Sequence, residues 1–60
     1  MKSLGEEFKE RKNELGITTE QLSRLSGIPI GTINKILNGE TKSPRYTTLK
    51  ALNDVLFRDI

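Results

Sequence analysis

Glycine and proline divide this 60-residue chain into four short segments, each with the length and apolar spacing of a helix. These segments span about residues 3–15, 18–26, 29–38 and 45–57. No segment alternates polar and apolar residues as a strand does, and the sequence contains no internal repeat. The spacing therefore predicts a single all-α domain of four short helices over residues 1–60.

Composition narrows the functions open to so small a chain. Cysteine and histidine are both absent, which excludes disulfides, thiolate chemistry, zinc sites and imidazole acid–base catalysis. The carboxylates are scattered, and no two of them stand out as an acid–base pair. The longest apolar run, Val55-Leu56-Phe57, is too short for a membrane span or a signal peptide. We therefore expect no enzyme, no metal and no cofactor, and a cytoplasmic location.

Capping residues mark where the helices begin and end. Ser3 and Glu6 match the capping box, in which two residues exchange hydrogen bonds at a helix start, and Thr18 and Gln21 match it again. Glycines stand where a left-handed residue ends a helix. These glycines are Gly16, Gly27 and Gly39.

Apolar residues recur at helical spacing in every segment and predict one modest core. The 33% of residues that are hydrophobic are enough for one core of this kind. The residues expected on the buried faces are Leu4, Phe8 and Leu15, then Leu22 and Leu25, then Ile33, Ile36 and Leu37, and finally Tyr46, Leu49, Leu52, Val55 and Leu56.

Residues 19–38 form the most distinctive unit, two short helices joined by a tight turn. Packing two helices at a steep angle requires a small residue in the first helix and a turn residue that tolerates positive φ. Ser23 and Gly27 meet these two requirements. The second helix must also be held by apolar residues, which are Ile28, Ile33 and Ile36. This spacing is that of a helix-turn-helix.

Three runs, ITTEQLS (17–23), GIP (27–29) and TINKILNG (32–39), resemble the phage-repressor (Cro/repressor, Xre-like) helix-turn-helix family. The run TKSPRYTTL (41–49) resembles the loop and fourth helix of lambdoid repressors. The resemblance implies a lambda-repressor-like DNA-binding domain of four or five helices, whose third helix enters the major groove of double-stranded DNA. It also implies a homodimer on DNA, with half-sites about 34 Å apart.

The resemblance assigns the reading of bases to the third helix. Its first residues are the base-reading positions of the family, which hold Ile30 and Gly31 here, and Thr32, Asn34 and Lys35 face the same groove. Neither Ile30 nor Gly31 has a polar side chain, so bidentate hydrogen bonds to bases are lost at both positions. Ile30 is instead expected to contact a thymine methyl group.

The resemblance also implies contacts with the DNA backbone. Asn38 and the loop residue Lys42 match phosphate-binding residues, and Arg45 resembles an arginine that approaches the minor groove. Thr19 stands where the family usually has glutamine, which leaves its hydroxyl and backbone N–H as donors. The complete set expected at the DNA is Thr18, Thr19, Gln21, Pro29, Ile30, Gly31, Thr32, Asn34, Lys35, Asn38, Lys42 and Arg45.

The distribution of charge agrees with this assignment. Between Ile33 and Tyr46 three cationic side chains face one anionic side chain, whereas the first 28 residues carry five of each. Phosphate binding requires excess positive charge on the side of the motif. The acidic residues of the first segment are expected to point away from DNA.

Three functions fit these features. The first is the DNA-binding domain of a bacterial or phage transcriptional regulator, which we carry forward. The second is a DNA-targeting module at the N-terminus of a larger protein such as a nuclease. The apolar residues Leu56 and Phe57 near the end of the chain favour a longer protein. The third is an antitoxin-like protein-interaction module, which the apolar Ile30 beside Gly31 favours.

Overall fold

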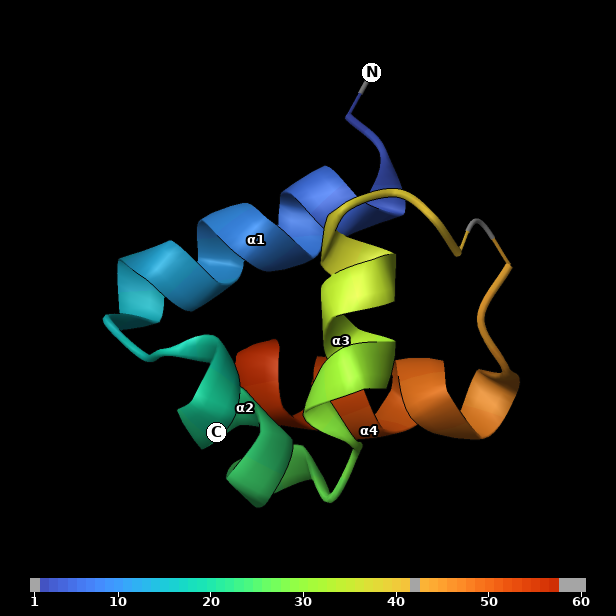
Figure 1. The fold of residues 1–60 in the computed structure, drawn as a ribbon. Helices are drawn as coiled ribbons and strands as arrows, with labels where there is room; N and C mark the ends of the chain where they lie inside the picture. Colours follow the sequence, from blue (N-terminus) through green and yellow to red (C-terminus); the bar gives the residue numbers. More distant parts are fainter. Residues whose placement is uncertain (1, 42, 58–60) are drawn as a thin grey trace.

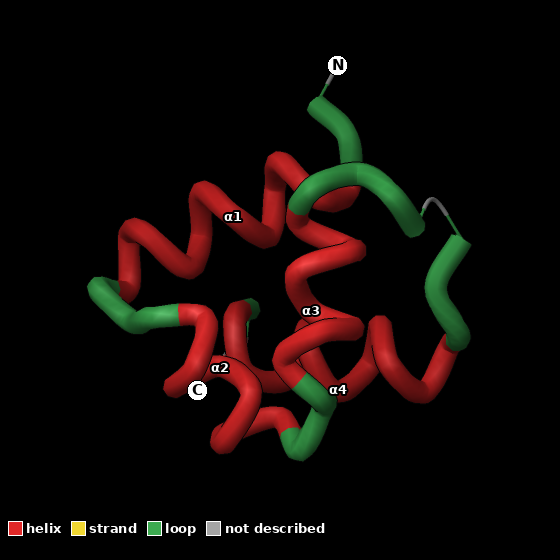
Figure 2. The backbone as a smooth tube through the Cα atoms, viewed as in Figure 1, coloured by secondary structure: helices red, strands yellow, loops and turns green. Residues whose placement is uncertain are grey.

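A computed structural model describes residues 2–41 and 43–57 of the chain. These residues form helices and loops and contain no strand. The helices are α1 (Leu4–Leu15), α2 (Thr19–Ser26), α3 (Ile30–Leu37) and α4 (Tyr46–Leu56). In Figures 1 and 2, α3 stands upright in the middle of the molecule, with α1 above and α4 behind its lower end. The predicted all-α class is confirmed.

The helices pack in a closed ring. Helix α3 packs against α1 and α2, and α4 packs against the same two helices from the other side. The order around the ring is therefore α1–α3–α2–α4. In this arrangement the edge formed by α2 and α3 lies opposite the edge formed by α1 and α4, so the two edges present separate surfaces.

Each helix begins one residue later than the sequence predicted, because the residue taken as the first is the N-cap. The backbone of Ser3, Thr18 and Arg45 is extended, and Pro29 has φ −54° and ψ 138°, so none of them has helical geometry. The last two helices also end one residue early. The residues that cap their C-termini are Asn38 and Phe57.

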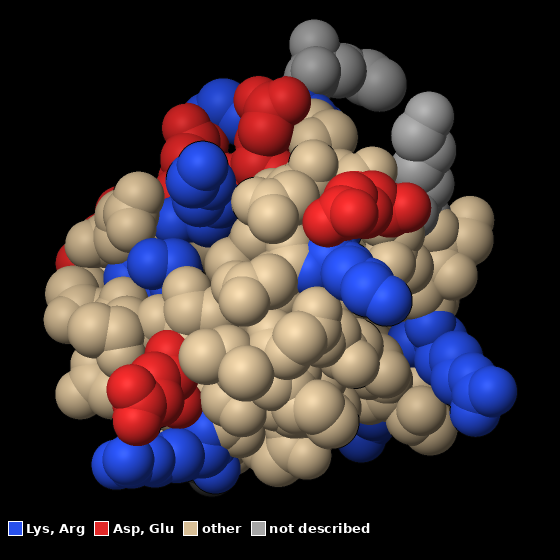
Figure 3. Space-filling model, in the orientation of Figure 1, with Lys and Arg blue, Asp and Glu red and all other residues tan. Residues whose placement is uncertain are grey.

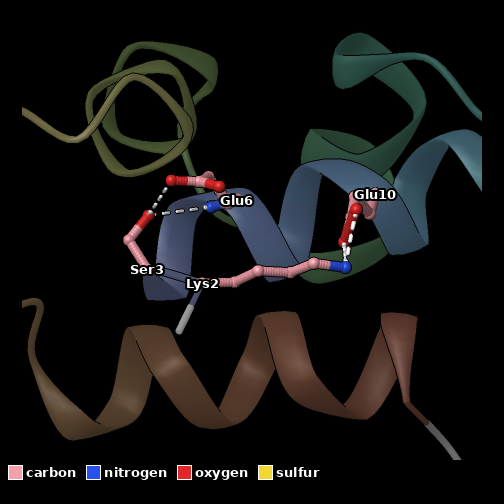
Figure 4. Close-up of polar contacts among 4 residues, drawn as sticks. All are labelled: Lys2, Ser3, Glu6 and Glu10. Atoms are coloured by element: carbon pink, nitrogen blue, oxygen red, sulfur yellow. Dashed lines mark hydrogen bonds and ion pairs between the residues drawn. The ribbon is translucent and has the colours of Figure 1, made fainter.

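The capping box predicted at α2 is confirmed, whereas the one predicted at α1 is only half formed. The N–H of Gln21 donates to Thr18 Oγ1 at 3.0 Å, and the N–H of Thr18 donates to Gln21 Oε1 at 2.8 Å. At α1 the N–H of Glu6 donates to Ser3 Oγ. The returning bond is different, because the Glu6 carboxylate accepts from the Ser3 hydroxyl instead of from a backbone N–H (Figure 4).

The core is a single cluster to which every helix contributes. Its side chains are at most 2% exposed, and half-buried apolar residues surround it. The fully buried members are Phe8, Leu22, Ile33, Ile36, Leu52 and Leu56.

Three residues that were predicted for this core are exposed instead. Leu15 is 42% exposed, Leu25 is 64% exposed and Tyr46 is 75% exposed. Leu15 and Tyr46 are terminal residues of α1 and α4, so neighbouring helices do not cover them. Leu25 is turned by roughly 60° from Leu22 around the axis of α2, which moves it to the rim of the buried face.

Within residues 2–41 and 43–57, no helix is both long enough and apolar enough to cross a lipid bilayer. The longest helix, α1, has 12 residues. The same residues bring together no group of three or more side chains that could hold a metal ion.

Candidate nucleic-acid interface

Hydrogen bonds from backbone and serine groups hold the turn between α2 and α3. Gly27 has φ +74°, a conformation that side chains other than glycine rarely adopt, and its N–H donates to the carbonyl of Ser23 at 2.9 Å. The Ser23 hydroxyl donates to the carbonyl of Ile28 at 2.6 Å. The N–H of Ile28 donates to Ser26 Oγ at 3.2 Å. Together these bonds fix the direction in which α3 leaves α2.

The role of these two serines was missed from the sequence. Ser23 was expected only as a small residue between the helices, and Ser26 was assigned no role. Serine hydroxyls commonly bond to nearby backbone groups at the ends of helices. The occurrence of two serines in the last four residues before Gly27 is the pattern that could have indicated them.

The predicted base-reading helix presents a continuous exposed face. Ile33 and Ile36 are buried and hold α3 to the core. Gly31, Lys35 and Asn38 are exposed and, at spacings of four and three residues, share the opposite side of the helix. The remaining exposed residues of α3 flank this line. They are Ile30, Thr32 and Asn34.

The first backbone N–H groups of α2 and α3 are free among the described residues. No hydrogen bond is formed by the N–H of Thr19 or Glu20 at the start of α2, nor by that of Ile30 or Gly31 at the start of α3. Such groups carry partial positive charge and suit phosphate oxygens. The donor predicted at Thr19 is therefore present, with the side chain half-buried. Its contact with phosphate stays a prediction.

The positive charges on α3 and at the start of α4 are not neutralised by ion pairs among the described residues. Lys35 and Arg45 are exposed and form no ion pair within residues 2–41 and 43–57. In contrast, Arg24 of α2 lies 3.0 Å from Glu20. Figure 3 shows an uncharged surface over the lower part of α3, with Lys and Arg side chains on both sides of it and a Lys or Arg side chain over the upper part of the helix. Acidic side chains lie at its margins.

Backbone hydrogen bonds to α3 hold the first residues of the loop that follows this helix. The carbonyl of Lys35 accepts from the N–H groups of Glu40 at 2.8 Å and Thr41 at 3.1 Å, and Gly39 donates to Ile36 at 3.2 Å. Arg45, at the other end of the loop, is the N-cap of α4. Lys42, which was predicted to bind phosphate, lies outside the described residues.

One backbone contact of α1 helps to place α3. The backbone of α1 touches α3 at Gly5, where an added Cβ would collide with the carbonyl oxygen of Ile36. This contact sets the position of α3. Away from this contact, Lys2, which precedes α1, forms an ion pair with α1 in which its Nζ lies 2.8 Å from Glu10 Oε1 (Figure 4). The bond to Glu10 raises the pKa of the Lys2 ammonium above its ordinary value of 10.5. The predicted orientation of the acidic residues of α1 away from DNA stays a prediction.

A family model described as helix-turn-helix matches residues 8–60, which include α2, the turn and α3. An uncharacterized HTH-type transcriptional regulator of Bacillus subtilis (strain 168), RghRB, is 38% identical over 56 residues, which are 93% of this chain and 40% of that protein. The HTH-type transcriptional repressor RghR of the same organism is 34% identical over 56 residues, 93% of this chain and 42% of its own length. The chain thus spans about two fifths of these relatives. No solved structure gives a significant match.

Proposed function

The chain belongs to the helix-turn-helix family, and on that premise we propose that it is the DNA-binding domain of a transcriptional regulator, with α3 in the major groove. The observation that carries the proposal is the exposed face of α3. The hydrogen bonds of Ser23 and Ser26 in the turn fix the direction of this helix relative to α2. The major groove of B-DNA is wide enough to admit an α-helix. The names of both relatives describe transcriptional regulators, which supports regulation as the purpose of binding.

Contacts with the phosphates would fix the helix in the groove. We assign these contacts to Asn38, Lys42 and Arg45 and to the free N–H groups at the start of α2. Phosphate contacts set register and orientation, whereas base contacts set sequence preference. Binding should therefore depend steeply on salt, because each neutralised phosphate releases counterions.

Dimer formation on DNA is part of the proposal. Helix-turn-helix proteins commonly place two copies on half-sites one helical turn apart. We assign no catalytic step to this domain, and we place its action in the cytoplasm. One relative is named a repressor, and we extend repression to this chain as the direction of regulation.

Charge reversal at Lys35 of α3 and at Arg45, the N-cap of α4, tests the proposal. The dissociation constant for a 20-base-pair duplex is measured by fluorescence anisotropy at several salt concentrations for Lys35→Glu and Arg45→Glu. Each variant should bind at least tenfold more weakly. The slope of log K against log salt should fall by about 1 for each phosphate that the variant no longer neutralises.

Lys50→Glu is the matched control for this experiment. Lys50 is exposed on α4 and lines the groove between α4 and α1, on the edge opposite the turn. Its reversal makes the same change in net charge and should alter the dissociation constant by no more than about twofold. If all three variants bind equally weakly, the net charge of the chain explains the loss of affinity, and no particular face is identified. Unchanged binding in Lys35→Glu and Arg45→Glu would exclude the proposed face.

A further inference from the structure

Asn38 is followed directly by Gly39, and no other asparagine of the chain precedes a glycine. In such a pair the backbone nitrogen of the glycine can attack the side-chain carbonyl carbon of the asparagine, because glycine has no Cβ to obstruct the approach. A new C–N bond forms, ammonia leaves, and the product is a five-membered cyclic imide. Water then opens the imide to aspartate or isoaspartate. The pair therefore contains both reacting groups of a deamidation, and water is the only other reactant.

The fold opposes this reaction at the other asparagines of the chain. Asn13, Asn34 and Asn53 lie inside α1, α3 and α4, and the residue after each of them is helical as well. A helical backbone directs the N–H of that next residue to a carbonyl of the preceding turn, away from the asparagine side chain. The next residues also carry a Cβ. Cyclisation at these positions therefore requires a helix to unfold.

Asn38 lies where the helical restraint ends. It is the C-cap of α3, Gly39 has φ +80°, and both residues are exposed. The N–H of Asn38 still donates to Asn34 at 2.9 Å, whereas the N–H of Gly39 makes a longer bond of 3.2 Å to Ile36. Exposed helix ends open at a low cost in free energy. With ψ −3° at Asn38 the closed turn keeps the two reacting groups apart, so cyclisation follows this opening.

We propose that Asn38 and Gly39 form a site of spontaneous deamidation, which leaves a carboxylate at position 38. The modification replaces a neutral amide that can donate hydrogen bonds by an anion that only accepts them. If Asn38 contacts phosphate, as the proposed function has it, the new charge repels that phosphate. Deamidation then weakens DNA binding. This consequence rests on the proposed function, whereas the chemistry at residue 38 does not.

Ageing of the purified chain tests the chemistry. The protein is incubated at neutral and at mildly alkaline pH, and peptide mass spectrometry follows the conversion of amide to carboxylate at each asparagine. Conversion at residue 38 should be at least about tenfold faster than at any other asparagine and should yield isoaspartate as well as aspartate. It should also accelerate with pH, because the attacking nitrogen of Gly39 must lose its proton.

Two glutamine variants serve as a matched pair in this experiment. Asn38→Gln keeps the amide but would need a larger ring to cyclise, so its conversion should be abolished. Asn34→Gln changes another exposed asparagine of α3 and should convert at residue 38 at the wild-type rate. Absence of conversion at residue 38, or equal conversion at all asparagines, would overturn the proposal.

Two aspartate variants test the consequence for binding. Asn38→Asp imitates one product and should bind a DNA duplex at least about fivefold more weakly than the wild type. Asn53→Asp introduces the same charge at an exposed position of the α1–α4 groove and should stay within about twofold of the wild type. If Asn38→Asp binds as tightly as the wild type, the inferred loss of binding is wrong and the proposed function stands. If the wild type binds no duplex, the proposed function fails, and the mass spectra still decide the chemistry.

Discussion

The Ser23 hydroxyl lies 2.6 Å from the carbonyl oxygen of Ile28, so a side chain of α2 is bonded directly to the backbone that leads into α3. Ser26 bonds the N–H of the same residue, which leaves Ile28 held at both of its backbone polar groups. In a helix-turn-helix the angle between the two helices decides whether the second helix fits the groove. The hydrogen bonds of the two serines therefore help to set the angle between α2 and α3 that DNA binding requires.

Replacing Ser23 by alanine should destabilise the fold by about 1–2 kcal/mol, because the part-buried carbonyl of Ile28 loses its donor. Urea unfolding measures this change in stability. Ser43→Ala, at an exposed loop position, is the control and should stay within about 0.5 kcal/mol of the wild type. The folded variant should also bind DNA more weakly. An unchanged midpoint for Ser23→Ala would show that this bond does not hold the turn.

Gly5→Ala should be among the most damaging single-methyl changes in the chain. Its Cβ would collide with the carbonyl oxygen of Ile36 and push α1 away from α3, at a cost of about 1–3 kcal/mol. Gly31→Ala is a matched control, since Gly31 is also helical but has open space around it. Thermal unfolding measures the difference. The melting temperature should be lower than that of the wild type for Gly5→Ala and not for Gly31→Ala. Equal melting temperatures would contradict the close contact at Gly5.

Arg11 connects two distant parts of the chain, and its removal should free the end of α4. Its Nε donates to the carbonyl of Leu56 at 2.6 Å, and its guanidinium lies 5.8 Å from the centre of the Phe57 ring. Arg11→Ala should cost about 1–2 kcal/mol, whereas Lys9→Ala on the exposed side of α1 should cost little. Denaturant unfolding compares the two. DNA binding by folded Arg11→Ala should be unchanged, because the contact lies on the edge formed by α1 and α4.

The ion pair between Lys2 and Glu10 predicts a pH dependence at the alkaline end. Because the hydrogen bond to Glu10 raises the pKa of Lys2, its stabilising effect is complete below about pH 10.5 and is lost as the pH rises through the higher pKa of the folded state. Both side chains are exposed, so the effect is small. Melting temperatures of the wild type and Lys2→Ala should differ by a constant amount from pH 6 to 9 and converge above pH 11. If the difference in melting temperature between the wild type and Lys2→Ala grew as the pH rose, the predicted direction of the Lys2 pKa shift would be wrong.

Local features of the sequence predicted the elements of this fold well. The capping box at Thr18 and the glycine ends are determined by residues three or four positions apart, and the family expected from runs around the turn is confirmed. Predictions that required a knowledge of neighbouring helices were less accurate. Leu25 has helical spacing from Leu22, yet the short α2 turns it to the rim of the core.

Contacts between distant residues were not predictable from the sequence. Arg11 and Leu56 are 45 positions apart, and no pattern around either residue indicates the other. The same applies to Gly5, whose need for glycine arises only where α1 meets α3. For the candidate interface, the sequence predicted which residues of α3 are exposed, because exposure follows helical period. It did not predict the serine bonds that orient the helix.

An amide NMR titration with a 20-base-pair duplex, at low and at high salt, tests the central claim most directly. We predict that shifts concentrate in residues 18–21, in residues 29–38 and at Arg45, and that they weaken as salt is added. Amides along the α1–α4 edge, including Glu7 and Asn53, should not move. The absence of any shift at low salt, or shifts centred on that opposite edge, would contradict the claim that α3 and its turn form a DNA-binding surface.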